Sequence, residues 1–166
     1  NDLLKSAGSI KDKISDITKQ EPLCDQAMVL ADLSGLLTTC TKVSDNSRVN
    51  ILSAFLSFYL ALNIEKKYKI GIITPYHAQS RLLHAMIRDT ASIHPEAKTI
   101  SSATVHQFQG SEKDVIIYDA VDCYRMKAPG ILLTSMQNDY ANRLFNVALT
   151  RSRGKFIGLA NVDYMK

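Results

Sequence analysis

Apolar runs of strand length alternate along this chain with longer stretches in which apolar residues recur at helical spacing. The apolar runs predict buried strands at residues 27–32, 69–74, 98–103, 114–121 and 155–160. The helical patterns predict helices at residues 2–19, 48–63, 76–89 and 140–151. Strands that are apolar throughout and alternate with helices are typical of a parallel sheet covered on both faces, so we expect an α/β fold.

Local signals predict where some of these helices begin and end. Ser47 is the predicted N-cap of the helix at 48–63, because a short hydroxyl side chain can accept from the first free backbone N–H groups. Pro75 suits the first turn of the helix that follows the second strand. Gly154 is predicted to stop the helix at 140–151.

Length and composition favour one globular domain. The chain has 166 residues, of which 46% are hydrophobic and 22% charged, and this is enough for one α/β core. Residues 1–22 are predicted to form a linker or edge helix, and residues 23–166 to form the domain. Because the first residue is asparagine, we expect a piece of a longer protein.

Cysteines, apolar runs and charge exclude several classes of protein. Cys24, Cys40 and Cys123 form no CxxC pair, so we expect no disulfide framework and no bound metal, and a reducing, cytoplasmic location. The longest apolar run, at 51–62, is shorter than the roughly 18 residues of a membrane span, so no membrane partner is expected. A net charge of +4 permits nucleic-acid binding but does not demand it.

The search for chemistry begins at the polar loops. Ligands of parallel sheets bind beside the carboxyl ends of the strands, and polar loops leave two such ends, at 74–79 and 104–112. The sequence contains neither a GxxxxGK[ST] phosphate loop nor a GxGxxG turn. Without a cradle of backbone amides and a hydroxyl for Mg²⁺, the chain lacks the main triphosphate site.

One polar segment occupies residues 102–112. Its candidate positions are Thr104, His106, Gln107, Gly110 and Glu112. The glycine allows close approach of the backbone, the threonine and histidine can donate to a phosphate, and the glutamate can accept from a ribose hydroxyl. His106 taken alone is equally typical of an ordinary polar loop.

A second segment, at 142–153, reads Asn-Arg-Leu-Phe-Asn-Val-Ala-Leu-Thr-Arg-Ser-Arg. Its helix presents Thr150 and Arg151 near its C-terminal end, which we expect to lie beside the carboxyl edge of the sheet. Arginine suits an oxyanion because it is always charged and forks onto two oxygens. Arg151 taken alone is also explained as a cation favoured by the helix dipole.

A third segment covers residues 70–81, Ile-Gly-Ile-Ile-Thr-Pro-Tyr-His-Ala-Gln-Ser-Arg. Thr74 and the adjacent backbone are candidates for contact with a sugar-phosphate strand. Tyr76 and Gln79 either join that contact or support the loop from inside, since a tyrosine at a helix start is usually partly buried.

These three segments, in this order over residues 69–161, resemble the second RecA-like domain of superfamily-1 helicases, most closely of their Upf-like branch. The segment at 102–112 is similar to motif V, and the segment at 142–153 to motif VI. The resemblance implies a three-layer RecA-like domain of the P-loop NTPase type that lacks its own phosphate loop. A Gln-Tyr-Arg segment found upstream in that branch has no match in residues 1–26.

The resemblance also implies roles for individual residues. ATP and Mg²⁺ would lie between this domain and a missing first RecA-like domain of the same protein, and Arg151 would be the catalytic arginine that reaches the γ-phosphate. The implied nucleotide-binding residues are Gly110, Glu112, Arg151 and Arg153. The implied contacts to single-stranded DNA or RNA are Thr74, Pro75, Tyr76, Gln79, Thr104, His106 and Gln107.

Two functions remain open from the sequence. The first is the C-terminal motor domain of an ATP-dependent helicase or translocase, inactive as an ATPase in isolation. The second is a non-catalytic module, derived from a helicase domain, that binds nucleic acid or protein. The joint presence of Glu112 and Arg151 favours the motor, since a binding-only module needs neither.

Overall fold

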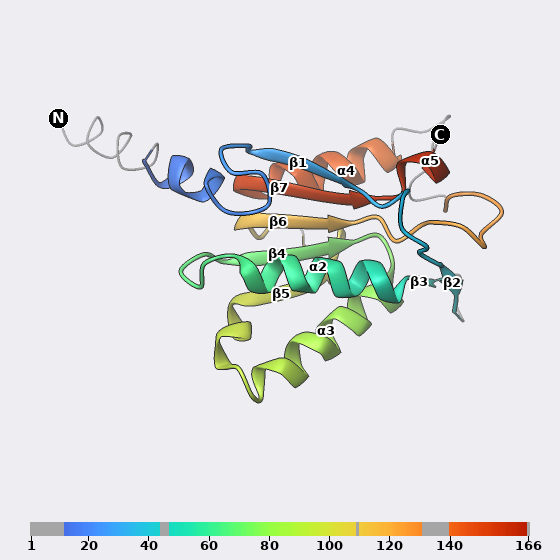
Figure 1. The fold of residues 1–166 in the computed structure, drawn as a ribbon, viewed down its shortest axis with the longest axis horizontal. Helices are drawn as coiled ribbons and strands as arrows, with labels where there is room; N and C mark the ends of the chain where they lie inside the picture. The colour runs from blue at the N-terminus through green and yellow to red at the C-terminus, as the bar shows by residue number, and fades with distance from the viewer. Residues whose placement is uncertain (1–11, 44–46, 109, 131–139, 166) are drawn as a thin grey trace.

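A computed structural model describes residues 12–43, 47–108, 110–130 and 140–165 of the chain. Its centre is a five-stranded sheet of order β1-β7-β6-β4-β5, in which every neighbouring pair is parallel (Figure 1). The strands are β1 (Met28–Asp32), β4 (Ile70–Thr74), β5 (Ile100–Thr104), β6 (Lys113–Asp119) and β7 (Ser152–Ala160). A short antiparallel pair, β2 (Thr41–Lys42) with β3 (Arg48–Val49), lies beyond the carboxyl edge of this sheet.

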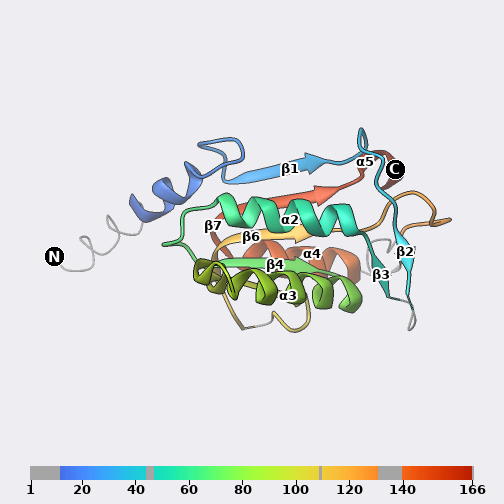
Figure 2. The same cartoon turned by 60° about the horizontal axis from the view of Figure 1, so that its bottom comes forward.

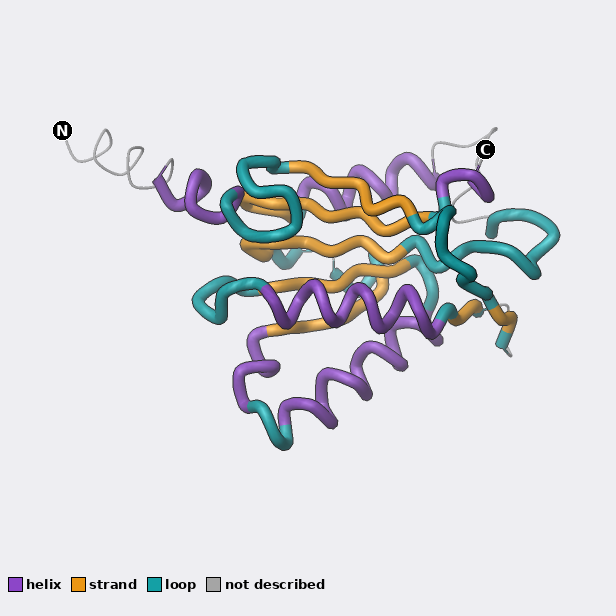
Figure 3. Tube along the Cα trace, in the orientation of Figure 1, coloured by secondary structure: helices purple, strands orange, loops and turns teal. Residues whose placement is uncertain are grey.

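Helices cover both faces of the sheet and complete three layers (Figure 2). The helices α2 (Ile51–Asn63) and α3 (His77–Ala91) lie on one face, and α4 (Tyr140–Thr150) lies on the other. Shorter helical elements are η2 (Pro95–Thr99), α5 (Val162–Met165) and residues 12–18. Residues 12–18 lie beside the amino edge of the sheet (Figure 3). None of the helices in the described ranges is long and apolar enough to cross a membrane.

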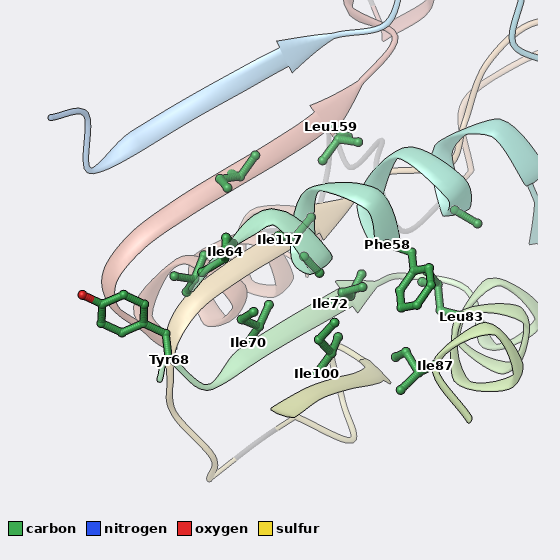
Figure 4. Close-up of a cluster of buried hydrophobic side chains, with 14 of the residues drawn as sticks. Phe58, Ile64, Tyr68, Ile70, Ile72, Leu83, Ile87, Ile100, Ile117 and Leu159 are labelled. Carbon is green, nitrogen blue, oxygen red and sulfur yellow. The ribbon is translucent and has the colours of Figure 1, made fainter. Parts of the chain in front are cut away.

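Successive side chains of the central strands point to opposite faces of the sheet and fill the core on both of its sides. Ile70, Ile72 and Ile117 point toward α2 and α3, where they meet Phe58 and Leu83 (Figure 4). The intervening positions face α4, so the two central strands are buried on both sides. Full burial of an isoleucine side chain is worth about 2–3 kcal/mol. The predicted α/β class, with a mainly parallel sheet between helical layers, is confirmed.

The predicted N-cap of the second helix is wrong. Helix α2 begins at Ile51, because the Asn50 side chain accepts from the backbone N of Ser53 at 3.1 Å and residues 48–49 form β3 instead. The Ser47 hydroxyl accepts from the backbone N of Ala78 at 2.9 Å and so serves the first turn of α3. Both residues are good caps, and tertiary pairing decides which helix each one serves.

Two further predictions are wrong: that Gly154 stops a helix, and that the first strand is buried. Strand β7 already begins at Ser152, so Gly154 lies inside a strand and does not stop a helix. A Cβ on Gly154 would meet Ile17 Cγ2 at 2.7 Å, which makes glycine necessary for this packing. The predicted buried strand β1 is an edge strand, and Met28 and Leu30 are 60% and 63% exposed. Residues 2–11 of the helix predicted at 2–19 lie outside the described residues, and residues 12–18 are helical. The other predicted strands and helices agree with the structure within two residues.

Lys155, on β7, attaches the N-terminal segment to the sheet. The residue is completely buried, and its ammonium donates to the backbone carbonyls of Thr18 at 3.2 Å, Leu23 at 3.1 Å and Gln20. Burial lowers the pKa of the Lys155 ammonium, and the negative charges of nearby acids oppose that shift. Three carbonyl acceptors compensate for the desolvation of the charge.

Replacing Lys155 with methionine should therefore lower the free energy of unfolding by about 2–4 kcal/mol, because three buried carbonyls lose their donor. Urea unfolding followed by circular dichroism measures the change. The matched control is Lys66→Met, whose ammonium is 67% exposed in an ion pair with Glu96, and it should cost less than about 1 kcal/mol. Equal, small effects of the two substitutions would show that Lys155 does not secure the segment.

Candidate functional site

The candidate residues lie in two clusters at opposite edges of the sheet. The carboxyl-edge cluster consists of Thr74, Pro75, Tyr76, Gln79, Thr104, His106 and Gln107. The amino-edge cluster consists of Gly110, Glu112, Arg151 and Arg153. The expectation that α4 ends beside the carboxyl edge is wrong. A helix that joins two parallel strands runs back against them, so α4 ends where β7 begins.

Pairing of β6 with β7 brings the amino-edge cluster together. The backbone N of Lys113 donates to the carbonyl of Arg151 at 3.0 Å, and Lys113 stands opposite Ser152 in the register. Glu112 and Arg151 therefore lie on adjacent strand entrances. The Arg153 Nε donates to Glu112 Oε2 at 2.9 Å, with the two side chains 57% and 50% exposed.

Arg151 is half-buried, and one of its side-chain hydrogen-bond donors has no acceptor among the described residues. Its backbone N donates to the carbonyl of Ala148 at 3.2 Å and closes the last turn of α4. Its Nε is buried, and no acceptor lies within hydrogen-bond distance among the described residues. A buried donor without a partner costs free energy.

A single loop joins the two clusters. After β5 the chain returns along the α4 face of the sheet to the entrance of β6, and Val105 and Phe108 anchor it in the core. A Cβ on Gly71 would meet Phe108 Cζ at 2.5 Å, so glycine on β4 makes room for the ring. Gly110 has a φ of 85°, in the left-handed region that favours glycine, and open space surrounds it.

The start of this loop is an ordered turn. The Gln107 side-chain oxygen accepts from both the backbone N and the hydroxyl of Thr104, each at 3.2 Å, and the backbone N of Phe108 donates to the Thr104 carbonyl at 3.0 Å. His106 and Gln107 are exposed at the tip of the turn. The turn thus presents two polar side chains outward at the carboxyl edge.

The four candidates of the loop at 74–79 are buried: Thr74, Pro75, Tyr76 and Gln79. Thr74 and Gln79 are completely buried, and Tyr76 is 5% exposed. Gln79 Nε2 donates to Asp119 Oδ2 at 2.7 Å, and the Gln79 oxygen accepts from the backbone N of Asn50 at 3.0 Å. These side chains support the loop at 74–79 from inside, and contact of that loop with a nucleic acid remains a prediction.

Sequence reasoning missed the two aspartates that organise this support. Asp119, at the end of β6, is completely buried; burial raises the pKa of its carboxyl to about 6, although hydrogen bonds from Gln79 and Ser53 oppose the shift. Asp122 accepts from the Tyr76 hydroxyl and pairs with Arg48, both at 2.9 Å. Two aspartates three positions apart after an apolar strand are the signal that could have found them.

A glycine completes the Asp122 cluster. The backbone N of Gly130 also donates to Asp122, and a Cβ on Gly130 would lie within 1.9 Å of the Tyr76 hydroxyl oxygen. Burial and the charge of Asp122 both raise the pKa of Tyr76, so the phenol stays protonated as a donor. The described ranges contain no group of three histidine, cysteine or acidic side chains placed to hold a metal ion.

A five-stranded parallel sheet between helical layers, with Arg151 between α4 and the last strand, is consistent with a RecA-like domain. A family model described as an AAA domain matches residues 1–163, and the chain belongs to this family.

The proteins that this chain matches by sequence include helicases. The chain is 33% identical over 120 residues to helicase Sen1 of Schizosaccharomyces pombe, covering 71% of this chain and 6% of that protein. It is 35% identical over 121 residues to the regulator of nonsense transcripts 1 homolog of Drosophila melanogaster, covering 66% and 10%. It is 31% identical over 126 residues to the mouse 5'-3' DNA helicase ZGRF1, covering 74% and 6%. The chain thus spans a tenth or less of these relatives, and the resemblance to superfamily-1 helicases of the Upf-like branch is confirmed.

The buried Asp119 predicts a specific dependence of stability on pH. Its pKa is about 6 in the folded protein and 3.8 for the free side chain, so its contribution to stability is complete below pH 3.8 and is lost as the pH rises through 6. This difference corresponds to about 3 kcal/mol. The free energy of unfolding of the wild type should therefore fall, relative to that of Asp119→Asn, between pH 4 and 6.5.

Urea unfolding at half-unit pH steps measures the difference between the two proteins. Asp89→Asn is the control, because that carboxylate is 69% exposed and its removal should leave the pH profile unchanged. A constant difference between wild type and Asp119→Asn across this range would contradict the shifted pKa.

Proposed function

We propose that this chain is the C-terminal motor domain of an ATP-dependent superfamily-1 helicase or translocase. In this function the amino-edge cluster faces a first RecA-like domain of the same protein, which binds ATP and Mg²⁺ with its own phosphate loop. The observation that carries the proposal is the position of Glu112 and Arg151 on adjacent strand entrances, joined by the bond from Lys113 N to the Arg151 carbonyl.

Arg151 is the proposed catalytic arginine. Its position at the sheet edge, half-buried and with a buried Nε that lacks an acceptor, suits a group that engages phosphate only when a cleft closes. A guanidinium in that place stabilises the charge that develops on the transferring phosphoryl group more than it stabilises bound ATP. Closure and reopening of the cleft would then couple hydrolysis to movement.

Glu112 and Arg153 are the proposed additional nucleotide contacts. Their ion pair is half-exposed at both ends, and such pairs contribute at most about 1 kcal/mol. A nucleotide can therefore displace the pair at little cost, with the glutamate accepting from the ribose hydroxyls and Arg153 turning toward the phosphates. Gly110, with its left-handed backbone, lets the loop approach the nucleotide closely.

The carboxyl edge is the proposed site for a single strand of DNA or RNA. His106 and Gln107 present donors there, and the backbone at Thr74–Pro75 lies beside them because Thr74 and Thr104 are register partners. The same loop carries His106 at one end and Glu112 at the other. Movement of the bound nucleic acid against the turn would thus shift the nucleotide contact at the other end of the loop. A translocase needs such a coupling.

Loss of Arg151 should stop catalysis in a protein that carries the upstream phosphate-loop domain. Arginine fingers are worth about 10³–10⁵ in rate, so Arg151→Ala should lower kcat by at least about 10²-fold and change ATP affinity little. Arg151→Lys should not rescue, because an ammonium cannot fork onto two oxygens. Arg153→Ala should have the smaller effect.

Single-turnover hydrolysis with equilibrium ATP binding makes these comparisons. The control is Arg88→Ala, which removes an exposed arginine paired with its neighbour Asp89, and the 166-residue chain alone should show no turnover above blank. If Arg153→Ala is the inactive variant, the arginine is misplaced by two residues. If every variant hydrolyses at the wild-type rate, the chain is a non-catalytic binding module.

Binding of the isolated chain to single-stranded oligonucleotides should be weak and should fall as salt rises, because phosphate contacts release counterions. The double substitution His106→Ala with Gln107→Ala should weaken it by about fivefold or more, at about 1 kcal/mol for a hydrogen bond. Fluorescence anisotropy over a salt series measures both effects. His84→Ala, an exposed histidine on α3, should change nothing. A tight complex that salt does not affect would contradict the proposed grip.

A further inference from the structure

Helix α2 is apolar on more than its inner side. The thirteen residues from Ile51 to Asn63 include no charged side chain. The inner side packs on the sheet through Ala54, Ser57, Phe58 and Ala61. A helix that is apolar around most of its circumference is normally covered on both sides, yet the described residues leave one flank of α2 about half-exposed.

The open flank carries a regular stripe. Leu52, Phe55, Tyr59 and Leu62 are 38%, 55%, 54% and 38% exposed. Their spacing of three, four and three residues is that of the a and d positions with which one helix packs against another. The Phe55 and Tyr59 rings already stack on each other, with centroids 6.4 Å apart and planes 15° from parallel. We call these four residues the α2 stripe.

The α2 stripe lies next to Phe58, the α2 residue that meets Leu83 of α3 (Figure 4). Phe55 and Leu62 are three and four positions from Phe58, so the stripe lies between the α3 side of α2 and solvent. The stripe continues into an apolar groove between the start of α2 and the segment that follows β1. Leu37, Val43 and Val49 line its far wall. Among the described residues, no side chain that lines this groove is charged.

The order of side chains in the α2 stripe is the same in both directions, Leu-aromatic-aromatic-Leu, and so is the spacing. A two-fold axis at the middle of the stripe would place Leu52 against Leu62 of a second copy, and Phe55 against Tyr59 of that copy. Such self-complementarity is what an isologous dimer requires, because each residue i meets j while j meets i. We propose that two copies of this chain associate through antiparallel packing of α2 against α2.

Area and charge fit a second copy. At about 200 Å² for each fully exposed large apolar side chain, the stripe with Ile51, Leu37 and Val43 exposes on the order of 800 Å², close to the share of each partner in a standard interface. Neither helix brings a charge to the contact, so the net charge of +4 is not concentrated where the copies meet. A single-stranded nucleic acid is a poorer occupant, because α2 offers its phosphates no cation.

Sedimentation velocity of the 166-residue chain between 1 and about 200 μM tests the proposal, since interfaces of this size start in the micromolar range. The wild type should dimerise reversibly. Phe55→Lys with Tyr59→Lys should raise the dissociation constant at least about 100-fold, because like charges meet across the axis. Phe55→Lys with Tyr59→Glu should recover at least tenfold of that loss, because each lysine then meets the glutamate of the other copy.

Two controls distinguish disruption of this interface from a change in nonspecific association and from unfolding of the variants. Leu30→Lys places the same charge on another apolar residue, 63% exposed on β1, and should leave the dissociation constant unchanged. Thermal melts at a concentration well below the dissociation constant should be alike for all variants, since the substituted positions are half-exposed.

A wild type that stays monomeric at every concentration would overturn the proposal. So would a dimer that resists the double lysine variant, or one that Leu30→Lys breaks. If the wild type is monomeric and Phe55→Ala with Tyr59→Ala lowers affinity for an oligonucleotide, the stripe stacks on bases instead. If it is monomeric and a longer form of the protein shields the stripe from solvent, another segment of the same polypeptide covers it.

Discussion

The pairing of β6 with β7 determines where every candidate nucleotide contact lies. Each strand begins directly after a residue with a proposed role, Glu112 before β6 and Arg151 before β7, and the bond from Lys113 N to the Arg151 carbonyl fixes the two entrances side by side. Because these strands are buried on both faces by isoleucine and valine, their register cannot slip without exposing the core. The sheet core thus holds the relative position of an exposed glutamate and a half-buried arginine at its edge.

The two edges of the sheet differ in how firmly their side chains are held. At the carboxyl edge, Gln79, Asp119 and Asn50 share buried hydrogen bonds, and Asp122 binds both Tyr76 and Arg48. At the amino edge the candidate side chains Glu112 and Arg153 are linked by a solvent-exposed ion pair. Moving the first set would leave buried polar groups unpaired, whereas rearranging the second costs little. The carboxyl-edge loops are therefore held more firmly than the exposed ion pair at the amino edge.

Periodicity predicted the central strands well because they are surrounded by apolar neighbours, whatever those neighbours are. Periodicity failed where the place of a helix cap or a strand depends on which other element of the fold lies beside it. Asn50 and Ser47 are equally good caps by type, and only the pairing of β2 with β3 assigns them. The apolar run at β1 reads as buried, but the chain has no further strand to pair with its outer side among the described residues. The partners Gln79 and Asp119 lie 40 positions apart, beyond any local pattern.

The sequence predicted the residues of the candidate site, and its prediction of where helix α4 ends was wrong. The motif strings identified Glu112 and Arg151 together, yet placing α4 at the carboxyl edge ignored that a crossover helix must return to the start of the next strand. The N-terminal segment shows a related consequence of strand order. Lys155 holds it to β7 only four residues beyond Arg151, and Lys13, on the same segment, pairs with Asp114 at the start of β6. Under the proposed function, the chain that arrives from the first motor domain is thus fixed to the same two strands that carry the nucleotide contacts. Force transmitted through that connection would act on the amino-edge cluster directly, and would reach the strand-binding loops only through the sheet.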